Sequence, residues 1–205
     1  MTARPLRWAV VVPVKGNPEG KTRLDVADGL RNRLAVAFGL DTVRAALAAE
    51  GVRDVLVVCP PELAAGFAAL GARVLAEEPH GLNAALRRGI AATDGRLGRA
   101  LLLGDVPALR PEALSRALAA ASEVPRAFVP DASGAGTVLS TARPGIAHRP
   151  RFGTGSRRAH REAGYRELLL PGFASLRADV DTVADLTRVS ALRPGRATAA
   201  ALAAV

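Results

Sequence analysis

Two hydrophobic patterns alternate along this chain. Short apolar runs of strand length are separated by longer segments in which apolar residues recur every three to four positions. The expected strands are Trp8–Val14, Asp54–Cys59, Arg73–Ala76, Ala100–Leu103, Ala127–Val129, Thr137–Ser140 and Leu176–Ala178. The expected helices are Asp28–Ala49, Glu62–Leu70, Leu82–Ala92, Pro111–Ser122, Ser156–Ala163 and Thr182–Ser190. The early strands are continuously apolar, which is typical of a mostly parallel sheet with helices on both faces, so the pattern predicts an α/β layered fold.

We expect one domain that spans residues 1–205. A chain of 205 residues can bury a sizeable core, and no internal repeat interrupts it. Residues 130–171 are rich in Gly, Pro, Arg and Ser, and we interpret them as a substrate-facing insertion in that domain. The alanine-rich tail, residues 197–205, is expected to fray or to cap the sheet.

Composition excludes several classes of protein. Hydrophobic residues make up 49% and charged residues 23% of the chain, which excludes wholesale disorder. The single cysteine, Cys59, excludes an intramolecular disulfide and a multi-cysteine zinc site. The apolar run that Lys15 ends is too short to cross a membrane, and no signal cleavage site follows it. We therefore expect a cytoplasmic protein with no membrane partner.

The charge balance points to an anionic partner. The chain has 28 basic and 19 acidic residues, a formal net charge of +9. All but two of the basic residues are arginines, spread along the whole chain, and aromatic residues make up only 3%. A single-strand nucleic-acid binder needs aromatic rings for base stacking, so we expect no nucleic-acid partner. Heavy use of arginine and alanine is typical of a GC-rich genome. Much of the positive charge is therefore expected to reflect codon usage rather than function.

The loop after the first strand is a candidate phosphate site. Residues 13–24 contain both lysines of the chain, Lys15 and Lys21, together with Arg23. Ligands of parallel sheets bind beyond the carboxyl ends of the strands, and a lysine ammonium suits a triphosphate or a leaving pyrophosphate. The loop is not a P-loop, because the position five before Gly20 is Lys15. The alternative is a solvated loop that caps the next helix.

A second candidate follows the third strand. Asn83 lies in the first turn of a helix that begins near Gly81. An amide there could read a base edge or a ribose, and the exposed backbone amides of a helix start favour an anion. The alternative is an ordinary N-terminal capping region, and His80 is given no role.

Three aspartates follow apolar strands. Asp105 comes after the fourth strand, and Asp179 and Asp181 stand two residues apart near the last one. In an extended chain this spacing puts both carboxylates on one side, where they repel unless a cation is near. Hard oxygen ligands suit Mg²⁺. The alternatives are a turn residue before Pro107 for Asp105 and a helix N-cap for Asp181.

Two glycine-rich segments complete the candidates. Phe152–Ser156 leads into a helix with several arginines and resembles an anion nest, the alternative being a flexible loop capped by Ser156. Asp131–Thr137 leads into a strand rather than a helix, so its Gly-Ala-Gly is not a dinucleotide fingerprint. No Gly-x-Ser-x-Gly elbow occurs, and Cys59 fits a buried structural thiol.

Taken in order, these segments resemble one family over about residues 8–190. The matching pieces are Pro13-Val-Lys15, Lys21-Thr-Arg-Leu24, Gly81-Leu-Asn83, Gly104-Asp105-Val-Pro-Ala-Leu109, Phe128-Val-Pro-Asp131, Gly136-Thr137, Phe152-Gly153, Ser156 and Asp179-Val-Asp181-Thr182. They are similar to the guanylyltransferases of deazaflavin coenzyme F-420 biosynthesis, the CofC/FbiD family. The resemblance implies a single-domain, glycosyltransferase-A-like nucleotidyltransferase fold.

The resemblance also implies a reaction. GTP is joined to a small phosphorylated three-carbon acid, phosphoenolpyruvate or 2-phospho-L-lactate, and pyrophosphate is released. An arginine- and alanine-rich chain suits an actinobacterial source, which favours phosphoenolpyruvate. The alternatives are a nucleotidyltransferase of the same fold that acts on a sugar phosphate or molybdopterin, and a basic nucleotide-binding module. Clustered aspartates disfavour the module, because carboxylates repel phosphates unless a metal intervenes.

Carried over position by position, the resemblance implies roles for eleven residues. Asp105, Asp179 and Asp181 match Mg²⁺ ligands; Thr137, Gly153 and Ser156 match contacts of the acid; Lys15, Lys21, Arg23, Gly81 and Asn83 match the nucleotide site. Lys15, Lys21 and Asp105 are the expected catalytic residues. The loop from Gly153 to Ser156 lacks the proline that relatives often carry, which bears on acid selectivity.

The expected mechanism needs no protein nucleophile. The phosphate of the acid attacks the α-phosphorus of GTP in line, and it needs no general base because it is already deprotonated at neutral pH. Beyond GTP and the acid, the sequence is compatible with a homodimer and with hand-over of the product to a downstream transferase.

Overall fold

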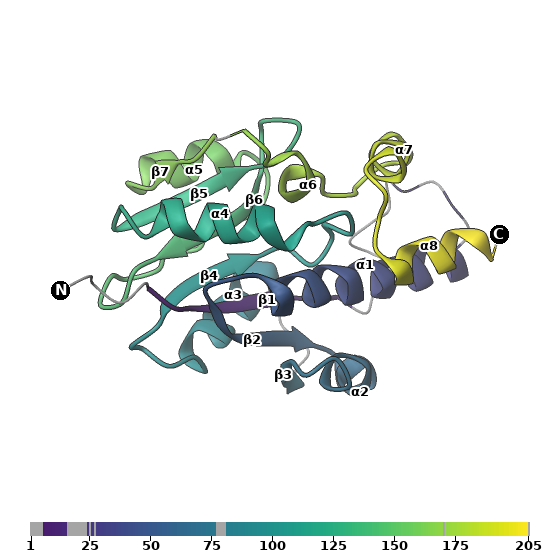
Figure 1. Cartoon of the computed structure of the whole chain (residues 1–205), viewed down its shortest axis with the longest axis horizontal. Helices are drawn as coiled ribbons and strands as arrows, with labels where there is room; N and C mark the ends of the chain where they lie inside the picture. The colour runs from purple at the N-terminus through teal and green to yellow at the C-terminus, as the bar shows by residue number, and fades with distance from the viewer. Residues whose placement is uncertain are drawn as a thin grey trace.

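A mixed sheet of seven strands forms the centre of the molecule (Figure 1). The computed structural model describes residues 6–15, 24, 26, 28–76, 81–169 and 171–204. The strands are β1 (Trp8–Pro13), β2 (Val52–Cys59), β3 (Arg73–Ala76), β4 (Gly98–Leu102), β5 (Arg126–Pro130), β6 (Thr137–Ala142) and β7 (Arg166–Glu167). Their order across the sheet is β3-β2-β1-β4-β6-β5-β7.

Strand direction decides which chain ends meet. Strands β3, β2, β1 and β4 are mutually parallel, and β5 is parallel to β7. Strand β6 runs antiparallel to both of its neighbours, β4 and β5. The first residue of β6, Thr137, therefore lies at the sheet edge where β1 and β4 end. The predicted mostly parallel α/β sheet is confirmed.

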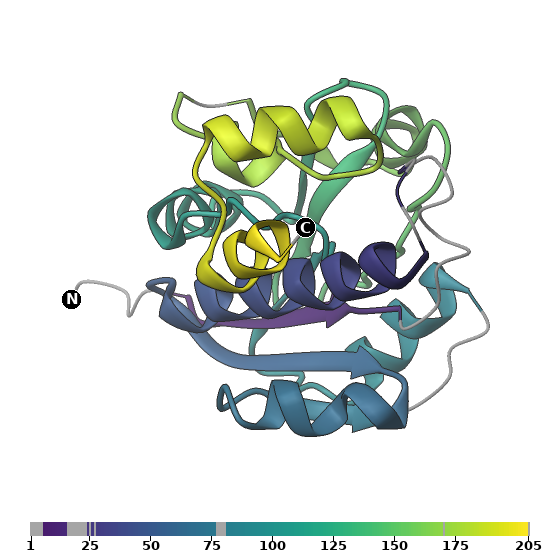
Figure 2. The same ribbon diagram turned by 90° about the vertical axis from the view of Figure 1, so that its right-hand side faces the viewer.

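Helices cover both faces of the sheet (Figure 2). They are α1 (Asp28–Ala48), α2 (Ala64–Ala68), which follows a 3₁₀ turn (Pro61–Leu63), α3 (Leu82–Ala91), α4 (Pro111–Ala121), α5 (Ser156–Glu162), α6 (Ala174–Arg177), α7 (Val183–Ala191) and α8 (Arg196–Ala203). Val10 and Val12 of β1 pack in one core cluster with residues of α1 and α4, whereas Val11 packs with Leu86 of α3. Both faces of β1 are thus buried, which explains its unbroken apolar run. None of the helices in the described ranges is long and apolar enough to cross a membrane.

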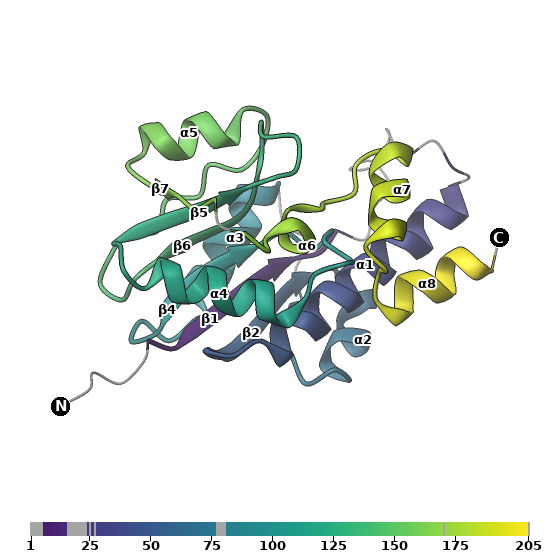
Figure 3. The same cartoon turned by 45° about the horizontal axis from the view of Figure 1, so that its top comes forward.

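The C-terminal tail docks on a helix. Helix α8 lies along α1 in all three views (Figure 3). The buried carboxylate of Asp41 in α1 accepts hydrogen bonds from the backbone N–H groups of Ala197 and Thr198, at 3.1 and 2.8 Å. An acceptor at the first turn satisfies donors that have no partner within the helix. The expectation of a frayed tail or a cap on the sheet is wrong, because Asp41 fixes the tail as a helix on α1.

One expected strand is also wrong. Residues Leu176–Ala178 were expected to be extended, but Ala174–Arg177 form the single turn α6. An apolar run of three residues is too short for its periodicity to separate strand from helix. The two-residue strand β7 was not predicted, for the same reason.

Candidate active site

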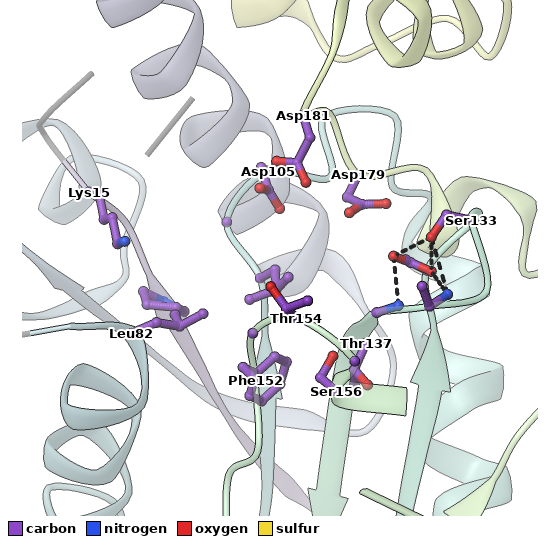
Figure 4. A pocket seen from close by; sticks show the side chains of 18 of the residues that line it. Lys15, Leu82, Asp105, Ser133, Thr137, Phe152, Thr154, Ser156, Asp179 and Asp181 are labelled. Carbon is purple, nitrogen blue, oxygen red and sulfur yellow. Dashed lines mark hydrogen bonds between the residues drawn. The ribbon is translucent and has the colours of Figure 1, made fainter. Parts of the chain in front are cut away.

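A cavity of about 530 Å³ opens at the carboxyl ends of β1 and β4 (Figure 4). Its walls come from seven parts of the chain: the ends of β1 and β4, Ala35 of α1, Leu82 at the start of α3, the loop before β6, the loop before α5 and the segment after α6. Seven residues singled out from the sequence line it: Lys15, Asp105, Thr137, Gly153, Ser156, Asp179 and Asp181. Gly81 and Asn83 do not line it, and Lys21 and Arg23 lie outside the described residues.

Asp105 reaches the cavity because β4 ends beside β1. Gly104 comes so close to β1 that a Cβ atom there would lie 2.7 Å from the carbonyl oxygen of Pro13. The carbonyl oxygen of Asp105 accepts a hydrogen bond of 3.0 Å from the backbone N–H of Val180. This bond joins the end of β4 to the segment that carries the other two aspartates.

Asp179 and Asp181 lie on the same side of the segment after α6, as their spacing predicted. The side chain between them, Val180, is fully buried in a cluster with Phe38, and both aspartates line the cavity. The alternative of an N-cap at Asp181 is wrong. Thr182 caps α7: its hydroxyl accepts from the N–H of Asp185 at 3.2 Å, and the Asp185 carboxylate accepts from the N–H of Thr182 at 2.9 Å.

Negative charge is concentrated on this wall. Burial, together with the facing carboxylates of Asp105, Asp131 and Asp181, raises the pKa of Asp179 to about 8. Figure 4 shows the carboxylates of Asp105, Asp179 and Asp181 turned toward the same space. Crowded carboxylates of this kind fit a divalent cation. In the described part of the chain, no group of three His, Cys, Asp or Glu side chains is arranged to hold a metal ion by itself. A bound ion would therefore take further ligands from phosphate or water, as Mg²⁺ commonly does.

Asp131 has a role that the sequence analysis did not assign. Its carboxylate accepts hydrogen bonds from the N–H groups of Gly134, Ala135 and Gly136, at 2.7, 3.1 and 3.0 Å, and from the Ser133 hydroxyl at 2.9 Å. These bonds fold the loop before β6 into a fixed turn. The run Asp-Ala-Ser-Gly is a turn signature of aspartate and glycine, so the signal was present.

The opposite wall carries hydroxyl groups and a glycine loop. Thr137 and Ser156 are buried and line the cavity beside Gly153, whose φ of 124° is one that side-chain-bearing residues rarely adopt. The arginines expected to flank this loop are engaged elsewhere. Arg157 donates to Glu167 Oε1 from Nε and from its terminal nitrogen, at 3.1 and 2.7 Å, and Arg161 binds the other oxygen of Glu167. The expectation of an arginine-flanked anion nest is wrong in that respect.

The amide of Asn83 is engaged by the protein itself. Its nitrogen donates to the carbonyl oxygen of Phe152 at 2.9 Å, and its oxygen accepts from the Phe152 N–H at 3.1 Å. Gly81 is the N-cap of α3, and no side chain caps that helix. The side chain of Asn83 is therefore not a cap of α3. It acts on the cavity through Phe152, which lines it.

Comparison with known proteins adds a family to this geometry. Residues 37–193 match the MobA-like NTP transferase domain. A phosphoenolpyruvate guanylyltransferase of Streptomyces avermitilis is 53% identical, over 97% of this chain and 95% of the relative. The fold is similar to that of a protein from Desulfovibrio desulfuricans G20 described as a nucleotide-diphospho-sugar transferase, with a TM-score of 0.70, 22% identity and coverage of 95% and 93% of the two chains. It is also similar to Rv0371c of Mycobacterium tuberculosis H37Rv solved in complex with manganese, with a TM-score of 0.57, 22% identity and coverage of 91% and 98%.

Proposed function

The chain belongs to the MobA-like NTP transferase family and, within it, to the phosphoenolpyruvate guanylyltransferases, and we propose that it transfers the guanylyl group of GTP to phosphoenolpyruvate with release of pyrophosphate. One structural observation carries the proposal: carboxylates line one wall of a single cavity and buried hydroxyl groups line the other. Two phosphorylated substrates must meet in such a reaction, and each wall suits a different part of them.

The residues of the cavity walls are proposed to bind different parts of the two substrates. Lys15 stands at the end of β1 and supplies positive charge for the phosphates of GTP. We propose that the hydroxyl groups of Thr137 and Ser156, which line the cavity, donate to the acid. We propose that Asp105, Asp179 and Asp181 hold Mg²⁺, which when bound would screen the repulsion between the two phosphates. A fold neighbour solved with manganese supports a divalent cation in this fold.

The proposed step makes one bond and breaks one. A phosphate oxygen of phosphoenolpyruvate bonds to the α-phosphorus of GTP, and the bond from that phosphorus to the oxygen bridging to the β-phosphorus breaks. The electron pair leaves with pyrophosphate. The attacking phosphate is deprotonated at neutral pH, so no residue has to remove a proton. The chain contributes by holding both substrates in line and by balancing their charge.

Three further parts of the proposal rest on the family. We place the reaction in the biosynthesis of coenzyme F-420 and in the cytoplasm, where GTP is available. We assign residues 130–171 the acid side of the cavity, since Asp131, Thr137 and the loop from Phe152 to Ser156 lie in this range. We keep Lys21, Arg23, Gly81 and Asn83 as nucleotide contacts.

The test is pyrophosphate release by the purified protein with GTP and Mg²⁺. Three parallel reactions contain phosphoenolpyruvate, 2-phospho-L-lactate or neither acid. Release that requires phosphoenolpyruvate supports the proposal, and release that requires 2-phospho-L-lactate corrects the acid. If folded protein that binds GTP releases no pyrophosphate with either acid, the proposal is contradicted. A screen of sugar phosphates and molybdopterin then tests for another acceptor.

A further inference from the structure

His160 is a buried histidine that the proposed reaction has not used. It lies on α5, fully buried, in a cage of aromatic rings. The Phe128 ring stacks on it with centroids 5.5 Å apart, and the rings of Phe152 and Tyr165 meet it edge-on at 5.2 and 5.0 Å. The cage fixes the plane of the imidazole directly behind the hydroxyl wall of the cavity.

The partners of the ring decide which nitrogen carries the proton. Nε2 lies 3.3 Å from the backbone nitrogen of Arg151, whose N–H can only donate, so Nε2 must accept. Nδ1 lies 2.9 Å from the carbonyl oxygen of Ser156, which can only accept. Burial lowers the pKa of His160 to about 4, so the ring is neutral at pH 7 and has one proton. Both contacts are satisfied only when that proton is on Nδ1. The other tautomer would set two N–H groups against each other and a lone pair against a carbonyl oxygen.

This tautomer restricts the hydroxyl group of Thr137. Its oxygen lies 3.1 Å from Nδ1. Because Nδ1 carries the proton, it has no lone pair to offer, and the hydroxyl oxygen takes the acceptor role in a shared hydrogen bond. The hydrogen of the hydroxyl is then left for another acceptor. In the part of the chain that the structure describes, His160 is the one hydrogen-bond partner of this hydroxyl, and Thr137 lines the cavity.

We propose that His160 is a positioning residue that makes the Thr137 hydroxyl a hydrogen-bond donor into the cavity, toward an oxygen of the phosphorylated acid. The proposal rests on the proposed function for the identity of that ligand. The fixed donor favours an ionised carboxylate or phosphate, which has only acceptors, and selects against a group that would itself donate there. The same proton is also shared with the carbonyl oxygen of Ser156, and the orienting role proposed for the ring concerns the Thr137 hydroxyl alone.

The tautomer is tested without any reaction. In protein labelled with ¹⁵N in its histidines, two-bond ¹H–¹⁵N correlation spectra assign the proton of each ring. The expected result for His160 is a protonated Nδ1 and an unprotonated Nε2, unchanged between pH 8 and pH 6. A proton on Nε2, or protonation of both nitrogens within this range, overturns the proposal.

The consequence for the substrate is tested with two amide substitutions. An Asn side chain can place its N–H₂ group near the position of Nδ1, whereas a Gln side chain reaches the position of Nε2. We expect His160→Gln to raise the KM for phosphoenolpyruvate by about tenfold, the loss of one hydrogen bond to a charged group, with the KM for GTP unchanged. We expect His160→Asn to restore the KM for the acid to within about threefold of the parent value.

A double-mutant cycle separates positioning from general support of the fold. Thr137→Val removes the hydroxyl that His160 is proposed to orient, and Thr137→Ser keeps it. In the Thr137→Val background, His160→Gln should add less than about a twofold change in the KM for the acid. The proposal is overturned if His160→Gln still raises the KM for the acid about tenfold in the Thr137→Val background. It is also overturned if His160→Gln changes the KM values for the acid and for GTP equally. If the parent protein shows no acid-dependent turnover, the proposed function is contradicted instead. In that case, and also if His160→Gln does not fold, the histidine ring spectra of the parent protein still decide the tautomer.

Discussion

Asp105 is the cavity residue whose position depends least on long loops, because it stands three residues after the end of the buried strand β4. Replacing its carboxylate with an amide removes a charged ligand while keeping the shape of the side chain. We expect Asp105→Asn to lower kcat by about two orders of magnitude or more, the scale seen when one charged group that supports a transition state is lost. The measurement is pyrophosphate release at saturating GTP and phosphoenolpyruvate, with a melting curve to confirm folding.

A matched control for this substitution lies at the other end of the molecule. Asp94 is an exposed carboxylate paired with Arg96 at 2.9 Å, and it does not line the cavity. Asp94→Asn should therefore keep the parent kcat. Near-parental turnover of Asp105→Asn would remove Asp105 from the metal site.

Ser156 tests the acid side of the cavity. Its side chain is buried and lines the wall opposite the aspartates. We expect Ser156→Ala to raise the KM for phosphoenolpyruvate by about tenfold and to leave the KM for GTP nearly unchanged, since one hydrogen bond to a charged ligand is lost. Ser190→Ala, a substitution on the exposed side of α7, is the control. An equal rise in both KM values would argue against an acid contact at Ser156.

The sequence predicts single residues well where the chemistry is local and poorly where the partner is distant. Asp105, Asp179 and Asp181 could be placed at one edge because strand direction brings chain ends together. The partner of Asn83 is the backbone of a residue 69 positions away, so no spacing rule could reveal it. The pairing of Arg157 with Glu167 was likewise invisible, because Glu167 lies on the two-residue strand β7.

At the scale of elements, the approach of β4 to β1 determines the shape of the cavity floor. A Cβ atom at Gly104 would lie 2.7 Å from the Pro13 carbonyl oxygen and 3.1 Å from a methyl group of Val14. We expect Gly104→Ala to lower the free energy of unfolding by about 1–3 kcal/mol, the range for overpacking in a rigid site. It should also reduce turnover, because Asp105 is displaced with the strand end.

Urea unfolding and steady-state kinetics together check this prediction. Gly95→Ala is the matched control, because a Cβ atom at Gly95 meets no heavy atom within 4 Å. If Gly104→Ala and Gly95→Ala are equally stable and equally active, the close approach of β4 to β1 has no energetic role.

The elements that the sequence predicted correctly are those with enough residues to show a period. The six expected helices and the first six strands all occur, with their ends moved by at most two residues apart from the start of the second helix, which begins as a 3₁₀ turn. Helix α8 was missed as a docked element because alanine repeats carry little periodic contrast. Its position depends on one carboxylate, Asp41, located 156 residues earlier in the chain.

At the scale of the whole molecule, net charge and site charge have opposite signs. The chain carries +9, yet the described lining of the cavity contains four aspartates and one lysine. An anionic substrate and an acidic wall can share a cavity only if a cation lies between them. The net charge of the chain therefore points to an anionic substrate. The four aspartates of the cavity point to a cation that binds together with that substrate.

This opposition predicts how stability responds to metal. Without a divalent ion, the partly buried carboxyl group of Asp179 faces three others, and its raised pKa means that folding near pH 7 must either protonate it or bury its charge. An amide at this position has neither cost. We expect Asp179→Asn to melt at a higher temperature than the parent in chelator, and Mg²⁺ to raise the Tm of the parent more than that of the variant. At a free Mg²⁺ concentration ten times its Kd, linkage gives about 1.4 kcal/mol, or roughly 3–6 °C for a chain of this size. Melting curves with chelator and with Mg²⁺ measure both effects, and Asp94→Asn should follow the parent in each. A variant that is less stable than the parent in chelator, with no difference in its response to Mg²⁺, would mean that the acidic wall is not built around a cation.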